Sequence, residues 1–317
     1  MNYEPLTNFH MEGIFLFYKP IGWTNKSIVG SLKRILQVGK LGHAGTLDPF
    51  AEGLMVVAIG RKFTRGLHDL LTASTKEYIA TIELGKTSDT FDNTGTITVT
   101  SSDARPSIDD VRHIIETHLL GERTQVPPVY SAKKFAGKRL RDIATKEGAH
   151  ELAASRAKQV TLYDYDVISY SYPLLTVRLS VSSGYYIRTF GNDLGKLLGT
   201  GAYLTGLKRT RINGYSADDA LAPDDLEHVI QAQGLLLGAV QGVGYRYSIK
   251  NLAERYHCTG YVHNLPDGSV SFLAQGTVRD VSSFLQFVLP GPFASRVEDH
   301  SFLITKPHEL FSEFSAQ

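Results

Sequence analysis

Cysteine is nearly missing from this chain of 317 residues, which carries only Cys258. A single thiol excludes an intramolecular disulfide and a zinc site built from cysteines, and we expect no metal. Long hydrophobic runs are missing too, because no stretch approaches the roughly 18 consecutive apolar residues of a membrane helix. Residues 1–10 include Glu4 and no apolar segment, so we expect no secretory signal. We therefore predict a cytoplasmic protein without membrane contact.

Neither sign of charge is in excess, since the formal net charge at pH 7 is +1. Residues 1–228 hold 27 basic and 25 acidic residues, and the remainder holds 6 and 7. Overall charge therefore gives no indication of a nucleic-acid partner, and any affinity for RNA has to come from local patches. Two basic patches are present, one of Lys133, Lys134, Lys138, Arg139 and Arg141, and one of Lys208, Arg209 and Arg211. Taken alone, each patch is better explained as a solvated loop.

What the sequence does contain is a series of amphipathic segments, in a length that suits about two domains. Apolar and polar residues alternate from Tyr78 to Leu84, which is the pattern of a half-buried strand. Ser107 and Asp110 form a helix-start signature, and Gly121 suits the end of that helix. Further strands are expected at residues 14–18, 54–59, 159–168 and 174–182, and further helices at residues 27–37 and 188–198. Strands and helices do not alternate strictly, which favours the α+β class.

The C-terminal region has a pattern of its own. Residues 223–233 are expected to form a helix that ends at Gly234. After it, strands are expected at residues 235–240, 259–263, 270–274 and 296–305, with helices at residues 249–256 and 278–288. This β-α-β-β-α-β order is that of a ferredoxin-like domain, and Asp267-Gly268 is a hairpin signal. We therefore predict two domains, residues 1–232 and residues 233–317.

A carboxylate stands in a glycine-rich turn between a predicted helix and strand. Residues 42–54 read Gly-His-Ala-Gly-Thr-Leu-Asp-Pro-Phe-Ala-Glu-Gly-Leu. Asp48 precedes Pro49, which disfavours helix at the aspartate, and the glycines allow a ligand to approach the backbone. An aspartate is ionised at neutral pH and can attack an electrophilic carbon. Without further context, a plain Asp-Pro turn without chemistry is the simpler interpretation.

Further motifs change that interpretation. Residues 42–54 resemble the catalytic motif of the TruB family of tRNA pseudouridine synthases. Collinear blocks similar to the same family occur at residues 15–24, 76–95, 127–139, 182–195 and 207–211. Two positions depart from the family pattern: Tyr18 replaces the usual aspartate before Lys19, and Asn25 replaces the usual serine after Thr24. The resemblance covers roughly residues 10–225 and implies a mixed α/β pseudouridine-synthase domain.

The resemblance implies that the enzyme isomerises the T-loop uridine of tRNA, uridine 55, to pseudouridine without a cofactor. It makes Asp48 the nucleophile or base, paired with Arg188, and makes Tyr78 the residue that stacks on the base and takes the C5 proton. The target nucleotide has to be flipped out, because its glycosidic carbon cannot be reached inside a stacked loop. The resemblance also implies substrate-binding roles. Lys19 supports the pocket, Leu207 forms a pocket wall, and His43 fills the gap left by the flipped nucleotide. Contacts to the RNA backbone fall on Tyr130, Lys133, Lys134 and Arg139. Simpler alternatives are a core tyrosine for Tyr78, a structural ion pair for Arg188 and a turn histidine for His43.

A second glycine-rich segment, residues 238–246, joins a predicted strand to a predicted helix. Backbone N–H groups of Gln241, Gly242, Val243 and Gly244, together with the Arg246 guanidinium, are suited to bind a phosphate. Tight packing explains such a turn equally well until residues 260–270 are considered. The two segments resemble the signatures of acylphosphatases over about residues 234–315, with Tyr245 for the usual phenylalanine and His263 for a common lysine or arginine. The resemblance implies that Arg246 binds an acyl phosphate and Asn264 orients the attacking water, without a metal.

Three hypotheses follow for the whole chain. The first is a synthase fused to an active acylphosphatase. The second makes the C-terminal domain a non-catalytic RNA-binding or docking module, which its net charge of −1 disfavours. The third makes the N-terminal half mainly a tRNA folding chaperone, which the joint presence of Asp48, Tyr78 and Arg188 disfavours. TruB relatives usually carry a C-terminal PUA barrel, and here the acylphosphatase-like region follows instead.

Overall fold

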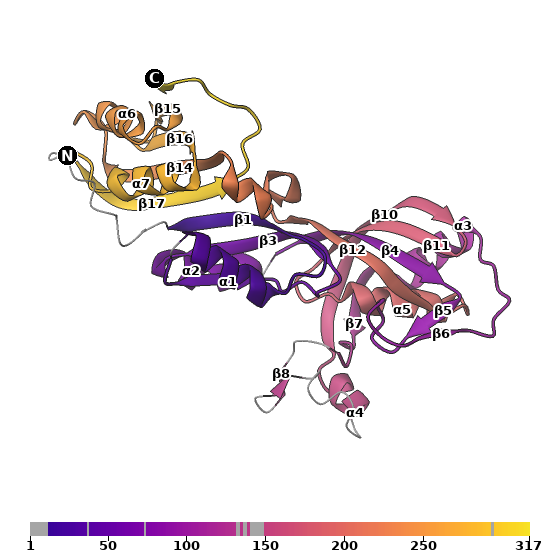
Figure 1. Cartoon of the computed structure of the whole chain (residues 1–317). Coiled ribbons are helices and arrows are strands. Elements are labelled where there is room, and N and C mark those ends of the chain that lie inside the picture. The colour runs from indigo at the N-terminus through magenta and orange to yellow at the C-terminus, as the bar shows by residue number, and fades with distance from the viewer. Residues whose placement is uncertain are drawn as a thin grey trace. The chain divides into compact units, whose positions relative to one another are not determined.

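The computed structural model describes residues 12–36, 38–72, 74–130, 134–135, 138–139, 149–292 and 295–317 (Figure 1). It separates into a first unit of Met1–Pro49, Gly53–Leu71 and Tyr215–Gln317, and a second unit of Phe50–Glu52 and Thr72–Gly214. These bounds differ from the two predicted domains, because the first unit combines N-terminal and C-terminal strands. Within the described ranges, no helix has both the length and the apolar character to cross a membrane.

The N-terminal part of the first unit is a small α/β layer. Its elements are β1 (Gly13–Lys19), α1 (Asn25–Leu36), β2 (Leu41–Ala44), β3 (Glu52–Ile59) and α2 (Arg61–Thr72). β1 pairs antiparallel with β3, and β2 pairs antiparallel with residues 56–59 along the other edge of the same strand, so β3 is central. The side chains from Phe15 to Phe17 are almost completely buried, which explains the uninterrupted apolar run in the sequence. The predicted strand at 14–18 and helix at 27–37 are confirmed.

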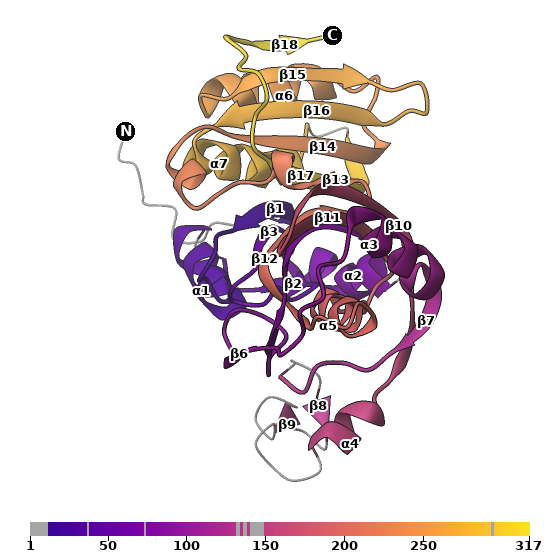
Figure 2. The ribbon, with the colours of Figure 1, turned by 90° about the vertical axis from the view of Figure 1, so that its right-hand side faces the viewer.

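The C-terminal part of the first unit has the predicted β-α-β-β-α-β order. Its elements are β14 (Ile230–Ala239), α6 (Tyr245–Arg255), β15 (Thr259–Asn264), β16 (Val270–Gly276), α7 (Val278–Val288), β17 (Arg296–Thr305) and β18 (Phe314–Ala316). The strands lie in the order β17-β14-β16-β15-β18, and the two helices pack together against the same sheet (Figure 2). β18 was not predicted, because three residues are too few to show a period.

The predicted helix at residues 223–233 is wrong. Only Asp224–Glu227 forms a single turn of 3-10 helix, after Pro223, and the Asp225 carboxylate accepts a hydrogen bond from the N–H of Ala222 (2.8 Å). The chain then extends, and β14 begins at Ile230 rather than at residue 235. Pairing with β16 on one side and β17 on the other satisfies the backbone of this segment, which outweighs its local helical pattern.

Strand β17 connects the two parts of the first unit. It pairs antiparallel with β14 and parallel with β1, with Ile14 opposite Leu303 and Phe15 opposite Ile304. Lys62 at the start of α2 forms an ion pair with Asp299 of β17 and also donates to the carbonyl oxygen of His300. The last strand of the ferredoxin-like order is therefore not a sheet edge, since β1 covers it.

The second unit is built on an antiparallel sheet with the order β12-β4-β11-β10-β7. Its elements are β4 (Lys76–Leu84), β5 (Lys86–Ser88), β6 (Ile97–Val99), α3 (Ile108–Ile114), β7 (Gly121–Gln125), β8 (Lys134–Phe135), β9 (Lys138–Arg139), α4 (Ala149–Ala154), β10 (Lys158–Ser171), β11 (Leu174–Val181), α5 (Ile187–Leu197) and β12 (Ala202–Ile212). Ser107 and Asp110 form the predicted capping box at the start of α3, and Gly121 has a left-handed φ of 85° where that helical segment has ended. Helices and strands in both units confirm the α+β class.

Gly195 allows α5 to approach β12 closely. A Cβ atom built on Gly195 would lie 2.2 Å from the backbone nitrogen of Ala202 and 2.4 Å from the carbonyl carbon of Gly201. Backbone atoms cannot give way as the end of a side chain can, so any larger residue would displace the helix from the sheet.

We expect Gly195→Ala to lower the free energy of unfolding by about 2 kcal/mol, because the added methyl group overpacks this contact. The matched control is Gly30→Ala in α1, where a Cβ atom meets nothing within 4 Å. That substitution should raise stability by about 0.5–1 kcal/mol through the helix propensity of alanine. Urea unfolding of both variants checks the pair, and equal effects would contradict this account of α5 packing.

Candidate active site

The Asp48 turn lies between β2 and β3 in the first unit, and its backbone is held by the segment that follows β1. Lys19 is completely buried, and its Nζ donates to the carbonyl oxygens of Pro49 and Pro20 (3.1 Å each). The N–H of Gly22 donates to the same Pro49 oxygen (2.9 Å). Asp48 itself is partly exposed. Lys19 thus contacts the backbone beside the aspartate, as a supporting residue would.

Arg188 lies in the first turn of α5 in the second unit, and its guanidinium is buried. Nη1 forms an ion pair with Asp92 (3.1 Å) and donates to the carbonyl oxygen of Thr90 (3.1 Å), while Nη2 donates to the carbonyl oxygen of Tyr130 (3.0 Å). The side chains of the ion pair are 5% and 4% exposed. The expected pair between Arg188 and Asp48 joins residues of different units and stays a prediction.

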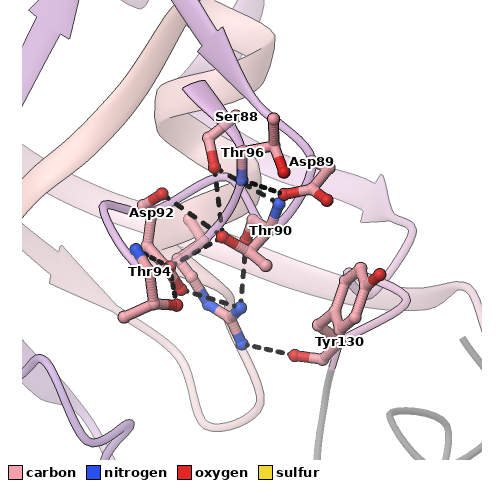
Figure 3. Close-up of polar contacts among 8 residues, drawn as sticks. Ser88, Asp89, Thr90, Asp92, Thr94, Thr96 and Tyr130 are labelled. Atoms are coloured by element: carbon pink, nitrogen blue, oxygen red, sulfur yellow. Dashed lines mark hydrogen bonds and ion pairs between the residues drawn. The ribbon is translucent and has the colours of Figure 1, made fainter. Parts of the chain in front are cut away.

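A polar loop holds Asp92 in place (Figure 3). Its Oδ1 accepts hydrogen bonds from the hydroxyl of Thr90 (2.8 Å) and from the N–H of Thr94 (2.9 Å), while Oδ2 faces Arg188. Asp89 accepts from the N–H of Thr96 in the same loop (2.8 Å). Both carboxylate oxygens of Asp92 are therefore engaged, which offsets the cost of burying the charge.

Sequence reasoning missed the role of Asp92 and treated it only as part of a motif. The usable signal was an aspartate among threonines, just before Gly95. A Cβ atom on Gly95 would lie 2.1 Å from Oδ1 of Asp89, so the loop closes tightly there.

Tyr78 and Leu207 lie on one face of the second unit's sheet. Tyr78 is opposite Arg209, and Leu207 is opposite Ala80 on the neighbouring strand. Both side chains are buried, with 7% and 9% of their surface exposed. Helix α5 covers this face, since a Cβ on Gly191 would meet the side chain of Leu204, the partner of Ile82. One face therefore positions Tyr78 and Leu207, together with the helix that carries Arg188.

The remaining predicted RNA contacts come from several different elements. His43 is a half-buried residue of β2, and Tyr130 offers its backbone oxygen to Arg188. Lys134 and Arg139 are opposite each other on the short strands β8 and β9. Lys133 lies outside the described residues. The roles of all five side chains in RNA binding stay predictions.

Lys76 is an unpredicted buried cation at the start of β4. Its Nζ is 3.3 Å from the hydroxyl of Ser183, and only 8% of the residue is exposed. Burial, with the nearby charges of Arg209 and Lys158, lowers the pKa of Lys76 from 10.5 to about 8. The folded protein therefore releases this proton at lower pH than the unfolded chain does.

Because the pKa of Lys76 is lower in the folded protein, the charged amine destabilises the fold most strongly below pH 8. This destabilisation decreases as the pH is raised towards 10.5. We expect the wild-type free energy of unfolding to rise relative to Lys76→Met by about 2 kcal/mol between pH 7.5 and pH 9.5. Urea unfolding at both values measures the difference, with Lys33→Met on the exposed side of α1 as control. A difference that does not change with pH would contradict the buried position of the amine.

The predicted phosphate loop surrounds a cavity of about 450 Å³. It is lined by Val240, Gln241, Gly242, Gly244, Tyr245, Arg246, Tyr247, Asn264 and Ala316. Gly242 and Gly244 have left-handed φ values of 74° and 75°, and Gly244 precedes the first turn of α6. The Gln241 amide donates to the carbonyl oxygens of Leu265 and Ser269 (2.9 and 2.8 Å), so it ties the loop to the β15–β16 hairpin.

Arg246 and Asn264 meet at this cavity. Arg246 is exposed and donates to the carbonyl oxygen of Gln317. The Asn264 Oδ1 atom is buried, and among the described residues it has no hydrogen-bond partner. A buried acceptor without a partner is costly unless a ligand or water completes it. Of the loop residues predicted to bind phosphate, only Val243 is not among those that line the cavity.

Comparison with known proteins defines the class of the chain. The model of the TruB family pseudouridylate synthase N-terminal domain matches residues 33–187, and the acylphosphatase model matches residues 232–316. The chain belongs to the TruB family of pseudouridine synthases and carries a C-terminal acylphosphatase domain.

Particular relatives support the first assignment. The tRNA pseudouridine synthase B of Chlamydia muridarum is 42% identical over 235 residues, which cover 72% of this chain and 95% of that protein. The tRNA pseudouridine synthase B of Chlamydia pneumoniae is 43% identical over 217 residues, covering 68% and 89%. A chain of the crystal structure of a Cbf5-Nop10-Gar1 complex shares the fold at 20% identity and a TM-score of 0.52, covering 93% of this chain and 85% of that one. Both resemblances drawn from sequence motifs are confirmed.

Proposed function

We propose that this protein isomerises the T-loop uridine of tRNA, uridine 55, to pseudouridine, with Asp48 as the nucleophile or base. The observation that supports this proposal most directly is the Asp48 turn. Lys19 and Gly22 fix the backbone of this turn, in a chain that belongs to the TruB family. Two relatives that match 72% and 68% of this chain are named tRNA pseudouridine synthase B.

The chemistry needs few protein groups, because the reaction is an isomerisation. The N1–C1′ bond of the uridine breaks, the uracil turns within the site and a C5–C1′ bond forms. The C5 proton then leaves and N1 takes up a proton from water, so the composition is unchanged. The Asp48 carboxylate starts this sequence, and Tyr78 stacks on the base and takes the proton. Arg188 keeps the aspartate ionised, since an opposite charge nearby favours the charged form. Leu207 closes the pocket on the side of β12.

We expect Asp48→Asn to lower pseudouridine formation by about a hundredfold or more, because the amide can neither attack nor accept a proton. Release of tritium from C5-labelled uridine in an unmodified tRNA transcript measures the rate. The wild-type enzyme is expected to turn over, and the variant is expected to bind the same tRNA with unchanged affinity.

Two outcomes would contradict the proposal. Turnover by Asp48→Asn at the wild-type rate would remove the carboxylate from the mechanism. Binding of tRNA by the wild type without any tritium release would favour the chaperone alternative.

For the C-terminal domain, we propose hydrolysis of an acyl phosphate. Asn264 lines the cavity, and its buried Oδ1 is suited to orient a water molecule because it is an acceptor without a partner among the described residues. The Arg246 guanidinium and the N–H groups of residues 241–244 are suited to the phosphate. A docking module would need neither the cavity nor this pair of side chains, which disfavours the non-catalytic alternative.

We expect Arg246→Ala to lower hydrolysis of acetyl phosphate by about a hundredfold, since the substitution removes the cation that faces the phosphate. Arg255→Ala is the matched control, because it removes an exposed arginine from the same helix. Release of inorganic phosphate gives the rate. Equal rates for wild type and Arg246→Ala would exclude Arg246, and no hydrolysis by the wild type would favour a docking role.

A further inference from the structure

Asn25, the first residue of α1, forms two hydrogen bonds to the backbone of Leu47, 22 positions later in the chain. Its Nδ2 donates to the carbonyl oxygen of Leu47 (2.8 Å), and the N–H of Leu47 donates to its Oδ1 (3.4 Å). Asn25 is half-buried and Leu47 is 3% exposed, so the contact is largely shielded from water. Leu47 directly precedes Asp48, so the Asn25 side chain holds the peptide group that joins Leu47 to Asp48.

One peptide beyond the Asp48–Pro49 bond, the carbonyl group of Pro49 is held by the same segment. The oxygen of Pro49 accepts from the N–H of Gly22 and from Nζ of Lys19. Gly22 has a left-handed φ of 82° in the turn that starts at Pro20, where the N–H of Trp23 bonds back to the Pro20 oxygen. Residues 19–25 therefore hold the chain both before and after Asp48.

Proline removes one backbone group by which the Asp48 turn could be held. Pro49 has no N–H, so the peptide between Asp48 and Pro49 offers no donor by which the fold could fix it. Asn25 holds the peptide before Asp48 instead, through the carbonyl oxygen of Leu47. A side-chain amide can donate and accept at the same time, and Asn25 uses both functions on one residue. The hydroxyl of serine, which is the usual residue of the family at this position, is a shorter group with a single donor.

We propose that Asn25 is a positioning residue for the Asp48 carboxylate, acting through the backbone of Leu47. This inference rests on the proposed synthase function. Nucleophilic attack requires the reacting atoms to be aligned within a fraction of an ångström, and misplacement by about 1 Å can cost a hundredfold in rate. Loss of the amide leaves the carboxylate in place and removes the side-chain contact that holds the peptide before it.

The test is single-turnover pseudouridine formation by Asn25→Ala, Asn25→Ser and Ser27→Ala on a C5-tritiated tRNA transcript. Asn25→Ala should lower the rate constant by about tenfold or more, with an unchanged amplitude and unchanged affinity for tRNA. Asn25→Ser should recover part of the rate, because its hydroxyl can make one of the two bonds. Ser27→Ala removes the hydroxyl that forms three hydrogen bonds with Thr24 at the start of α1, without touching Leu47, and should keep the wild-type rate constant.

A merely structural role would lower the amplitude, which counts folded enzyme, and would leave the rate constant unchanged. That result would overturn the proposal, as would equal losses of rate constant in Asn25→Ala and Ser27→Ala. Wild type and Asp48→Asn are measured alongside. If the wild type is active and Asp48→Asn is inactive, the proposed function holds whatever the Asn25 variants do. A failure of the Asn25 inference can therefore be distinguished from a failure of the proposed function.

Discussion

The buried ion pair between Arg188 and Asp92 is the interaction on which the candidate site residues of the second unit depend. It joins the first turn of α5 to the polar loop after β5, and the same guanidinium reaches the backbone oxygen of Tyr130. Removing one member of such a pair leaves an uncompensated buried charge and costs about 3–5 kcal/mol. Three segments distant in sequence are thereby fixed around one arginine. The arrangement is stable because Thr90 and Thr94 satisfy the other carboxylate oxygen of Asp92.

In the first unit, the main structural requirement is to hold the partly exposed Asp48 on a rigid turn. Residues 19–25 contact the backbone of Leu47 and of Pro49, so the chain is held both before and after Asp48. The strand that leads into this segment, β1, also pairs with β17 of the acylphosphatase domain. Strand β1 therefore contacts the C-terminal domain and also leads into the segment that supports the Asp48 turn. This shared strand links the stability of the two regions.

Much of the fold could be predicted from the sequence, because it is carried by local periods. The alternation in β4, the capping box of α3 and the two helices of the C-terminal domain follow from residues close together in the chain. The predicted helix at 223–233 failed, since pairing of β14 with two neighbouring strands overrode the local pattern. For the site, Asp48 and Arg246 were recognisable from motifs. Asp92 and Asn25 were not assigned a role, because their partners Arg188 and Leu47 lie 96 and 22 positions away. Long-range partners of this kind leave no periodic signal.

The position of the product tests the account most directly. An unmodified tRNA transcript would be treated with the enzyme, digested with nuclease and analysed by mass spectrometry after pseudouridine-specific chemical labelling. The account predicts one pseudouridine, at the T-loop uridine, and an unchanged transcript when that uridine is replaced by cytidine. Pseudouridine at another position, or none in a tRNA that the enzyme binds, would contradict it.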